Sequence, residues 1–223
     1  MMAKREKSIE AFRREYMKDG RIAEDYATQT ACVLACHFDI SNNIAETAKQ
    51  LNELVTECGH LKTGFVGTPY LLHALTDNGY AETAYSLILR EEYPSWLFSV
   101  KMGATTIWER WNSYMVDKGM GPRGMNSFNH YAYGCVCEWI WETAAGIACD
   151  SSAPGFAKIV MSPIPDKRLG HVEAEYQSAA GLIRSAWRYE GEQWIWDFTV
   201  PEGAVGVVTV PGQDEAKEYP AGT

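Results

Sequence analysis

The sequence has no run of about 18 consecutive apolar residues, the length that a membrane-spanning helix needs. Residues 1–7 are charged and lack the apolar stretch of a secretory signal, so we expect a cytoplasmic protein. Basic residues are also few: 20 Lys and Arg stand against 29 Asp and Glu, a formal charge of −9. Without a basic excess to replace counterions, neither nucleic acid nor a membrane is an expected partner.

The six cysteines do not form a metal-binding pattern. Cys32 and Cys36 lie four residues apart in a predicted helix, and Cys135 and Cys137 flank a single valine. Neither pair is joined to a second pair, or to a histidine, at the spacing of a zinc site. We therefore expect no metal and no other cofactor, and we interpret the cysteines as small buried thiols in a reducing compartment.

The sequence is rich in aromatic residues, with eight Trp and twelve Tyr in 223 residues. This length allows one large domain, or a medium domain with a small one. The acidic charge permits a neutral ligand such as a carbohydrate, and sugar sites use indole and phenol rings. Large hydrophobic cores use the same rings, so composition alone does not decide between a sugar site and a core.

The hydrophobic pattern changes near residues 154–155. Before this point the spacing is helical, and helices are predicted at 4–18, 23–38, 43–59, 68–79, 80–91 and 127–146. Asn43 is the expected N-cap of the third helix, and Thr68 followed by Pro69 the expected start of the fourth. Two long loops join these helices, and the second is expected to hold a short helical piece at 107–111. The sequence thus predicts a helical domain over 1–153.

After the change, apolar and polar residues alternate, as in strands that are half-buried in a sheet. Strands are predicted at 159–161, 171–177, 182–189, 193–200 and 205–210, separated by turn residues. These short strands indicate a small antiparallel β-sandwich over 154–223. The predicted fold class is therefore α+β and multidomain, with helical hairpins first and the sandwich second.

The strongest candidate for chemistry is the run 104–111. Glu109 lies there between Trp108 and Trp111, and Arg110 follows it directly. A carboxylate between buried indoles must be hydrogen-bonded, ion-paired or shifted in pKa. It also suits a sugar-cleaving site, which needs a proton acceptor and flat apolar faces. A buried pair of Glu109 with Arg110 in a helical core explains these eight residues equally well.

Short motifs spread along the chain carry a family resemblance. They are Gln29-Thr30 and residues 62–69, 93–96, 103–111, 125–134, 146–147 and 154–156, and together they cover most of the chain in the same order. In these motifs the chain resembles the C-terminal half of the bacterial α-L-rhamnosidases, glycoside hydrolase family 78. The resemblance implies half of an (α/α)6 barrel of about six long helices, followed by a β-sandwich. It also implies an inverting hydrolase that releases terminal α-L-rhamnose.

The resemblance implies roles for individual residues. Glu109 matches the general base of the family, which takes a proton from the water that attacks the anomeric carbon. His130 matches a residue that hydrogen-bonds the sugar, although from the sequence alone an imidazole satisfied by nearby backbone is the better explanation. Trp96, Trp108 and Trp111 are expected to form walls of a pocket whose ligand is a rhamnoside.

The general acid of the family lies upstream of these motifs, in a segment resembling Asp-x-x-x-Arg-x-Glu-Arg that this sequence does not contain. Half a ring of helices also leaves apolar edges uncovered. Three explanations stay open: a fragment of a longer enzyme whose N-terminal half completes the barrel, a natural short form, or a homodimer that completes the ring. We expect weak activity of the chain alone, and the alternative is a non-catalytic carbohydrate-binding or interaction module.

Overall fold

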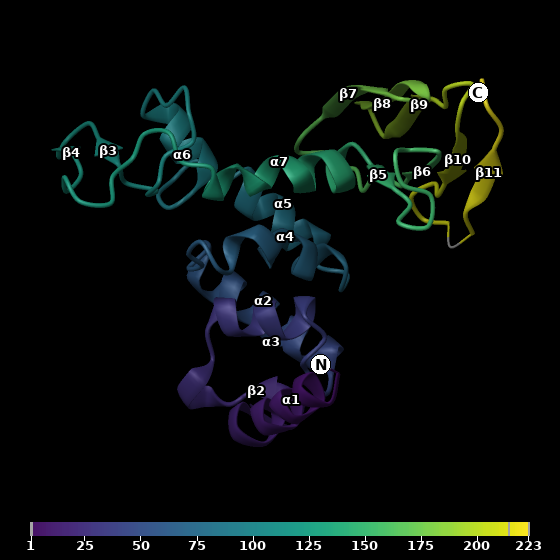
Figure 1. The fold of residues 1–223 in the computed structure, drawn as a ribbon. Helices are drawn as coiled ribbons and strands as arrows, with labels where there is room; N and C mark the ends of the chain where they lie inside the picture. Colours follow the sequence, from purple (N-terminus) through teal and green to yellow (C-terminus); the bar gives the residue numbers. More distant parts are fainter. Residues whose placement is uncertain (1, 214, 223) are drawn as a thin grey trace. The chain divides into compact units, whose positions relative to one another are not determined.

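A computed structural model describes residues 2–213 and 215–222, and it divides into two compact units between Val136 and Cys137. Figure 1 draws the first unit in purple to teal, mostly as helices, and the second in green to yellow, mostly as strands. The domain boundary predicted between residues 153 and 154 stays a prediction. The outer limits of that prediction, Met1 and Thr223, lie outside the described residues.

Helices build most of the first unit. Its α-helices, among the described residues, are α1 (Met2–Tyr16), α2 (Gln29–His37), α3 (Ile44–Cys58), α4 (Thr68–Thr76), α5 (Ala81–Ile88) and α6 (Trp96–Lys101). Helix α7 (Val136–Trp139) begins at the last residue of this unit, and a π-helix (Ile140–Ala144) continues it in the second unit. Short 3-10 helices (Glu24–Tyr26, Ala132–Cys135) and two small hairpins, β1 (Met17–Lys18) with β2 (Arg21–Ile22) and β3 (Tyr114–Met115) with β4 (Gly119–Met120), lie between the α-helices. Within the described residues, none of the helices is both long enough and apolar enough to cross a membrane.

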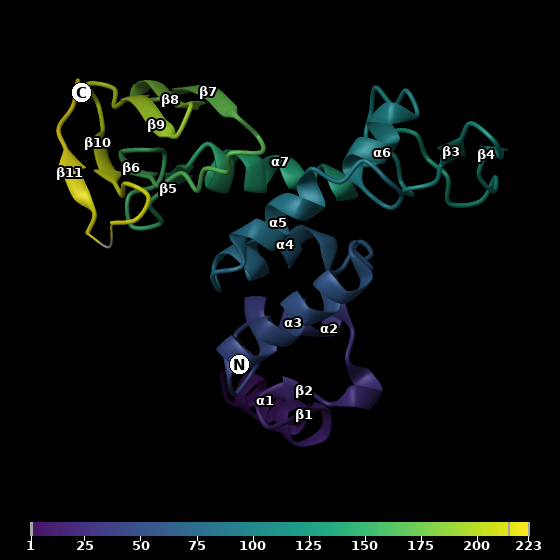
Figure 2. The ribbon, with the colours of Figure 1, turned by 180° about the vertical axis from the view of Figure 1, so that it is seen from behind.

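Helix α3 shows how local sequence defines an element. The Asn43 side chain accepts a hydrogen bond from the Glu46 backbone N–H at 3.2 Å, which is the predicted N-cap. Gly59 ends the helix in the left-handed region, at φ 70°, where a residue without Cβ is not strained. The inward side chains of α3 pack with α2 and α4, which lie beside it in Figures 1 and 2. The prediction for this helix is confirmed.

Two predicted helix starts differ from the structure. Helix α2 begins at Gln29 rather than near Ala23, because Thr28 caps it by accepting a hydrogen bond from the Ala31 N–H at 3.0 Å. Helix α4 has Gly67 as its N-cap, so the prediction of Thr68 was wrong by one residue. The Thr68 hydroxyl instead pairs with the hydroxyl of Thr63 at 2.8 Å, which ties the helix to the loop before it.

The helical piece predicted at 107–111 is absent, and helix α6 lies earlier, at Trp96–Lys101. Gly103, at φ 87°, follows the end of α6. The backbone after it bonds to a later segment of the chain, with Glu109 N donating to Ser127 O at 2.9 Å. This pairing also delays the last predicted helix, which begins near Ala132 rather than near Ser127.

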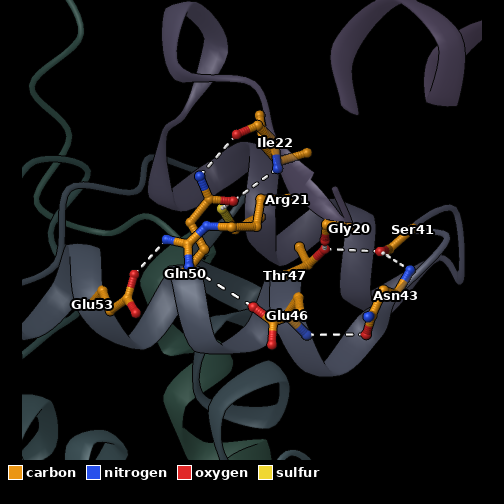
Figure 3. A network of polar contacts seen from close by, with 10 residues as sticks. Gly20, Arg21, Ile22, Ser41, Asn43, Glu46, Thr47, Gln50 and Glu53 are labelled. Atoms are coloured by element: carbon orange, nitrogen blue, oxygen red, sulfur yellow. Dashed lines mark hydrogen bonds and ion pairs between the residues drawn. The ribbon is translucent and has the colours of Figure 1, made fainter. Parts of the chain in front are cut away.

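A network of polar contacts attaches the β1–β2 hairpin to α3, as Figure 3 shows. The Ile22 N–H donates to Oε1 of Gln50 at 2.8 Å, and Nε2 of Gln50 donates to the Ile22 carbonyl at 2.9 Å. The Thr47 hydroxyl donates to the carbonyl of Gly20 at 2.7 Å. Gln50 and Thr47 are both buried, so these bonds satisfy backbone groups that water does not reach.

The second unit is a sandwich of two sheets. Its strands are β5 (Ile147–Cys149), β6 (Lys158–Met161), β7 (His171–Ser178), β8 (Gly181–Glu190), β9 (Gln193–Thr199), β10 (Val205–Val208) and β11 (Lys217–Tyr219). One sheet is the antiparallel meander β7-β8-β9, and the other has the order β11-β10-β6-β5. The five predicted strands are present. One pair, β6 with β10, is parallel, which the expectation of an antiparallel sandwich did not include.

Side chains from both sheets form the core of the second unit. Its buried members are Ile147, Ile159, Met161, Ile183, Val200, Ala204 and Val208. Strand β8 carries inward-facing Ile183 and Trp187, as its alternating pattern predicted. Two buried donors of this strand bond the turn before β5: the Trp187 Nε1–H reaches the Ala144 carbonyl at 2.6 Å, and the Ser185 hydroxyl reaches the Ala145 carbonyl at 2.6 Å.

Trp187→Phe is expected to lower the free energy of unfolding of the second unit by about 2 kcal/mol, because the buried Ala144 carbonyl loses its donor. Trp194→Phe is the matched control. Its Nε1 is buried without an acceptor among the described residues, so removing this N–H should cost at most about 1 kcal/mol. Urea unfolding followed by circular dichroism measures both, and equal losses would contradict the assigned bond.

The cysteines differ in exposure: the expectation of buried thiols holds for Cys32 and Cys36, whereas Cys137 and Cys149 are exposed, and two others, Cys58 and Cys135, are half-buried. Burial raises the pKa of Cys32 to about 12 and that of Cys36 to about 11. A raised thiol pKa lowers the thiolate fraction at any given pH, and the thiolate is the reactive form.

At about pH 8, Ellman's reagent should therefore modify the exposed Cys137 and Cys149 rapidly, whereas Cys32 and Cys36 should react only when the protein unfolds. Cys149→Ser should remove one equivalent from the rapid phase. A chain with both Cys32→Ser and Cys36→Ser should show as many rapidly reacting thiols as wild type in buffer without denaturant. If it shows two fewer, Cys32 and Cys36 are not buried.

Candidate functional site

Two segments of the first unit, 104–111 and 126–130, pair along their backbones. Glu109 N donates to Ser127 O at 2.9 Å, and His130 N donates to Ile107 O at 2.9 Å. The Thr106 hydroxyl adds a bond to the Phe128 carbonyl. Glu109 and His130 are 21 positions apart in the sequence, and the pairing places them on two adjacent segments of backbone.

The Glu109 carboxylate is held by the same pairing. Its Oε2 accepts a hydrogen bond from the Ser127 N–H at 2.7 Å, a short contact typical of a charged acceptor. Glu109 is half-buried, Arg110 is exposed, and no ion pair within 4 Å joins the two. The alternative of a buried Glu109–Arg110 pair in a helical core therefore does not hold.

Aromatic rings pack tightly behind this carboxylate. Trp111 stacks on Tyr133 with centroids 3.9 Å apart and planes 16° apart, and Trp96 meets Trp111 edge-on at 5.2 Å. The Trp96 Nε1–H donates to the Tyr133 carbonyl at 2.8 Å. Trp108 is 6% exposed and packs edge-on against Phe128. Trp111 is thus supported on two sides, and its position is well defined.

A hollow of about 430 Å³ opens beside Glu109. It is lined by Gly64, Phe65, Tyr93, Glu109, Arg110, Trp111, Asn112, Met125 and Tyr133, and we call it the Glu109 hollow. Within this lining Glu109 is the single carboxylate, and Phe65, Trp111 and Tyr133 contribute aromatic rings. One carboxylate among aromatic faces is an arrangement that can accept a proton beside the apolar side of a sugar ring.

His130 lies next to the Glu109 hollow without lining it. Its ring stacks on Phe65, with centroids 4.8 Å apart and planes 14° apart. The Ala132 N–H donates to Nδ1 of His130 at 3.3 Å, so in the neutral ring the proton lies on Nε2. Phe65 in turn lies 5.3 Å from Tyr133, and it therefore connects His130 to the wall of the hollow.

Trp96 and Trp108 line a second hollow, of about 370 Å³, on α6 and the segment after it. Its lining is largely apolar and includes Val100, Ile107 and Val136. Trp111 and Tyr133 contribute to both hollows. All three tryptophans predicted as pocket walls line the second hollow, and Trp111 also lines the Glu109 hollow.

Sequence reasoning did not single out three aromatic residues of the Glu109 hollow: Phe65, Tyr93 and Tyr133. Each lies inside a motif that carried the family resemblance, so a signal was present. The motifs do not show which of their side chains face a common space, because that depends on loop backbone rather than on spacing.

Two family models match the chain. The bacterial alpha-L-rhamnosidase 6 hairpin glycosidase domain matches residues 2–144, and the bacterial alpha-L-rhamnosidase C-terminal domain matches residues 146–222. The first defines the class of protein as a six-hairpin glycosidase, in agreement with helices that precede a β-rich unit. The chain belongs to the bacterial α-L-rhamnosidase family.

Curated relatives and solved structures agree with this. The chain is 40% identical to alpha-L-rhamnosidases of Formosa agariphila over 204 residues and of an Alteromonas species over 196 residues. These matches cover 90% and 86% of the chain but 22% and 21% of the relatives, so the chain spans about a fifth of their length.

Two solved structures are similar in fold. The Streptomyces avermitilis α-L-rhamnosidase complexed with L-rhamnose matches with a TM-score of 0.85 and 31% identity, over 96% of this chain and 22% of that one. The native Aspergillus terreus enzyme matches with a TM-score of 0.88 and 30% identity, over 99% and 26%.

Proposed function

We propose that this chain carries the general-base half of an inverting α-L-rhamnosidase site, with Glu109 as the base. The observation that carries the proposal is the Glu109 carboxylate, anchored by the Ser127 N–H and facing an aromatic hollow. In the reaction, water attacks the anomeric carbon from the face opposite the leaving group, and Glu109 takes its proton.

The hydrogen bonding of Glu109 supports this role. Oε2 accepts the Ser127 N–H, and within the described part of the chain Oε1 accepts no protein donor. A carboxylate beside a hollow, with one oxygen anchored and the other without a protein donor, can orient a water molecule. The anchor is a backbone N–H, so among substitutions at position 127 only proline removes the donor itself.

The aromatic lining supports L-rhamnose as the ligand. Trp111 and Tyr133 offer stacked rings that can cover the apolar face of a sugar. Phe65 adds a third aromatic ring, and the His130 ring stacks on it. We assign the sugar contact of His130 to its Nε2–H, which is the donor left by the bond at Nδ1. Trp96 supports Trp111 by an edge-on contact, whereas Trp108 packs edge-on against Phe128. The relative from Streptomyces avermitilis is complexed with L-rhamnose.

An inverting mechanism needs a second carboxyl group about 6.5–9.5 Å from the first, to protonate the leaving group. Glu109 is the single carboxylate that lines its hollow among the described residues. We therefore propose weak activity of the chain by itself on natural rhamnosides. The same observation favours a second candidate function, binding of rhamnose without catalysis. Completion of the site by a second copy, or by a further segment as in the longer relatives, stays a prediction.

Glu109→Gln is expected to lower the hydrolysis of p-nitrophenyl α-L-rhamnoside by at least about 100-fold, because an amide cannot accept the proton of water. Gln keeps an oxygen for the Ser127 N–H, so L-rhamnose binding measured by calorimetry should change by less than about threefold.

Glu92→Gln is the matched control, because Glu92 is exposed and lies outside the Glu109 hollow. It should leave both quantities unchanged. If Glu109→Gln hydrolyses the aryl rhamnoside as fast as wild type, Glu109 is not the base. If rhamnose binds saturably but wild type shows no turnover, the binding function is the correct one.

The leaving group provides a separate prediction. p-Nitrophenolate leaves without protonation, whereas the hydroxyl of a flavonoid or a sugar does not, and general acid help is worth about 10²–10⁴-fold. The purified chain should therefore prefer the aryl rhamnoside over a natural rhamnoside by more than about 100-fold in kcat/KM. Comparable rates on both substrates, each lost in Glu109→Gln, would show that the chain supplies its own acid.

A further inference from the structure

Gln29, the first residue of α2, joins two separate parts of the helical unit. Its side chain is 4% exposed, and its Nε2 donates to the His60 carbonyl at 3.0 Å. Nε2 also lies 3.4 Å from the carbonyl of Leu54 near the end of α3, and Oε1 accepts the Lys62 N–H at 2.5 Å. One buried amide therefore bonds both the last turn of α3 and the start of the loop that follows it.

The next residue of α2 contacts the other end of this loop, residues 60–67. A Cβ atom at Gly67 would lie 2.9 Å from the Thr30 hydroxyl oxygen, so only glycine allows the observed approach. Helix α4 begins directly after Gly67, and its first residue, Thr68, pairs its hydroxyl with that of Thr63 in the loop at 2.8 Å. The Gln29-Thr30 dipeptide thus defines where the loop begins and where it ends.

The loop carries Phe65 to the Glu109 hollow. Gly64, Phe65 and Val66 at its tip are exposed, so few contacts of their own hold them in place. The Phe65 ring nevertheless lies parallel to His130 at 4.8 Å and within 5.3 Å of Tyr133. A loop with an exposed tip keeps such a stacked geometry only if its ends are fixed.

We propose that Gln29 is a positioning residue of the sugar site. It touches neither the Glu109 hollow nor His130, and it acts by holding loop 60–67 so that Phe65 stays stacked on His130. The effect on sugar binding rests on the proposed function, because it requires that L-rhamnose occupies the Glu109 hollow. The effect on the Phe65–His130 stacking does not.

The chain offers a matched control in Gln50, the buried glutamine of Figure 3. Its side-chain amide also forms hydrogen bonds with backbone groups, namely the N–H and the carbonyl of Ile22. It lies on α3 and fixes the β1–β2 hairpin rather than loop 60–67. Gln29→Met and Gln50→Met each replace a buried amide with an unbranched side chain of similar length, so both should destabilise the fold.

Calorimetric titration with L-rhamnose tests the proposal. Gln29→Met should weaken binding by about tenfold, because a displaced loop misplaces Phe65 and His130, whereas Gln50→Met should change it by less than about twofold. In a chain that already carries Phe65→Ala, adding Gln29→Met should cause no further loss. Equal weakening by Gln29→Met and Gln50→Met, or a full further loss in the Phe65→Ala chain, would overturn the proposal.

A second readout does not depend on sugar. The face of Phe65 shifts the proton resonances of the His130 ring, and Gln29→Met should abolish this shift as Phe65→Ala does, whereas Gln50→Met should retain it. If wild type binds no rhamnose, the proposed function fails, and the inference about Gln29 is then decided by these resonances: retention of the shift in Gln29→Met overturns it. Gln29→Asn, too short to reach both His60 and Lys62, replaces Gln29→Met if that variant does not fold.

Discussion

Two hydrogen bonds between Glu109 and Ser127 are the constraint on which the candidate site depends. The backbone of Glu109 donates to Ser127, and the backbone of Ser127 donates to the Glu109 carboxylate. The carbonyl of Ile107, which a helix would pair with the N–H of Trp111, accepts the N–H of His130 instead, and 107–111 is not helical. The two bonds hold the Glu109 carboxylate at the edge of the Glu109 hollow. Two residues further along the chain, Trp111 stacks on Tyr133.

The helices behind these loops determine how the site is assembled. Helix α2 presents Gln29 and Thr30 to loop 60–67, and this loop brings Phe65 to His130. Segment 126–130 positions His130 from the other side through the Ile107 carbonyl. The hollow thus collects residues from four stretches of sequence, 64–65, 93, 109–112 and 125–133. Hydrogen bonds to backbone groups hold loop 60–67 and the segments 104–111 and 126–130. Small shifts of either loop would change its shape without altering the carboxylate itself.

Predictability from the sequence differed between elements for physical reasons. Helix α3 and strand β8 were predicted because a cap at Asn43 and a period of two around Ile183 and Trp187 are local signals. The piece at 107–111 was mispredicted because long-range pairing overrode local helical spacing. Glu109 was recognisable from its flanking indoles, but the aromatic residues that face it were not. Which ring of a motif points into a hollow depends on loop conformation.

The sequence by itself determined the order of a helical unit and a β-rich unit, membership of the bacterial α-L-rhamnosidase family, and Glu109 as the residue of interest. Only the tertiary structure decided that Trp111 lines the Glu109 hollow while Trp96 and Trp108 line the second hollow, and that Phe65 connects His130 to the Glu109 hollow. The reason is that composition and spacing act along the chain, whereas a binding site is formed by hydrogen bonds between segments far apart in sequence.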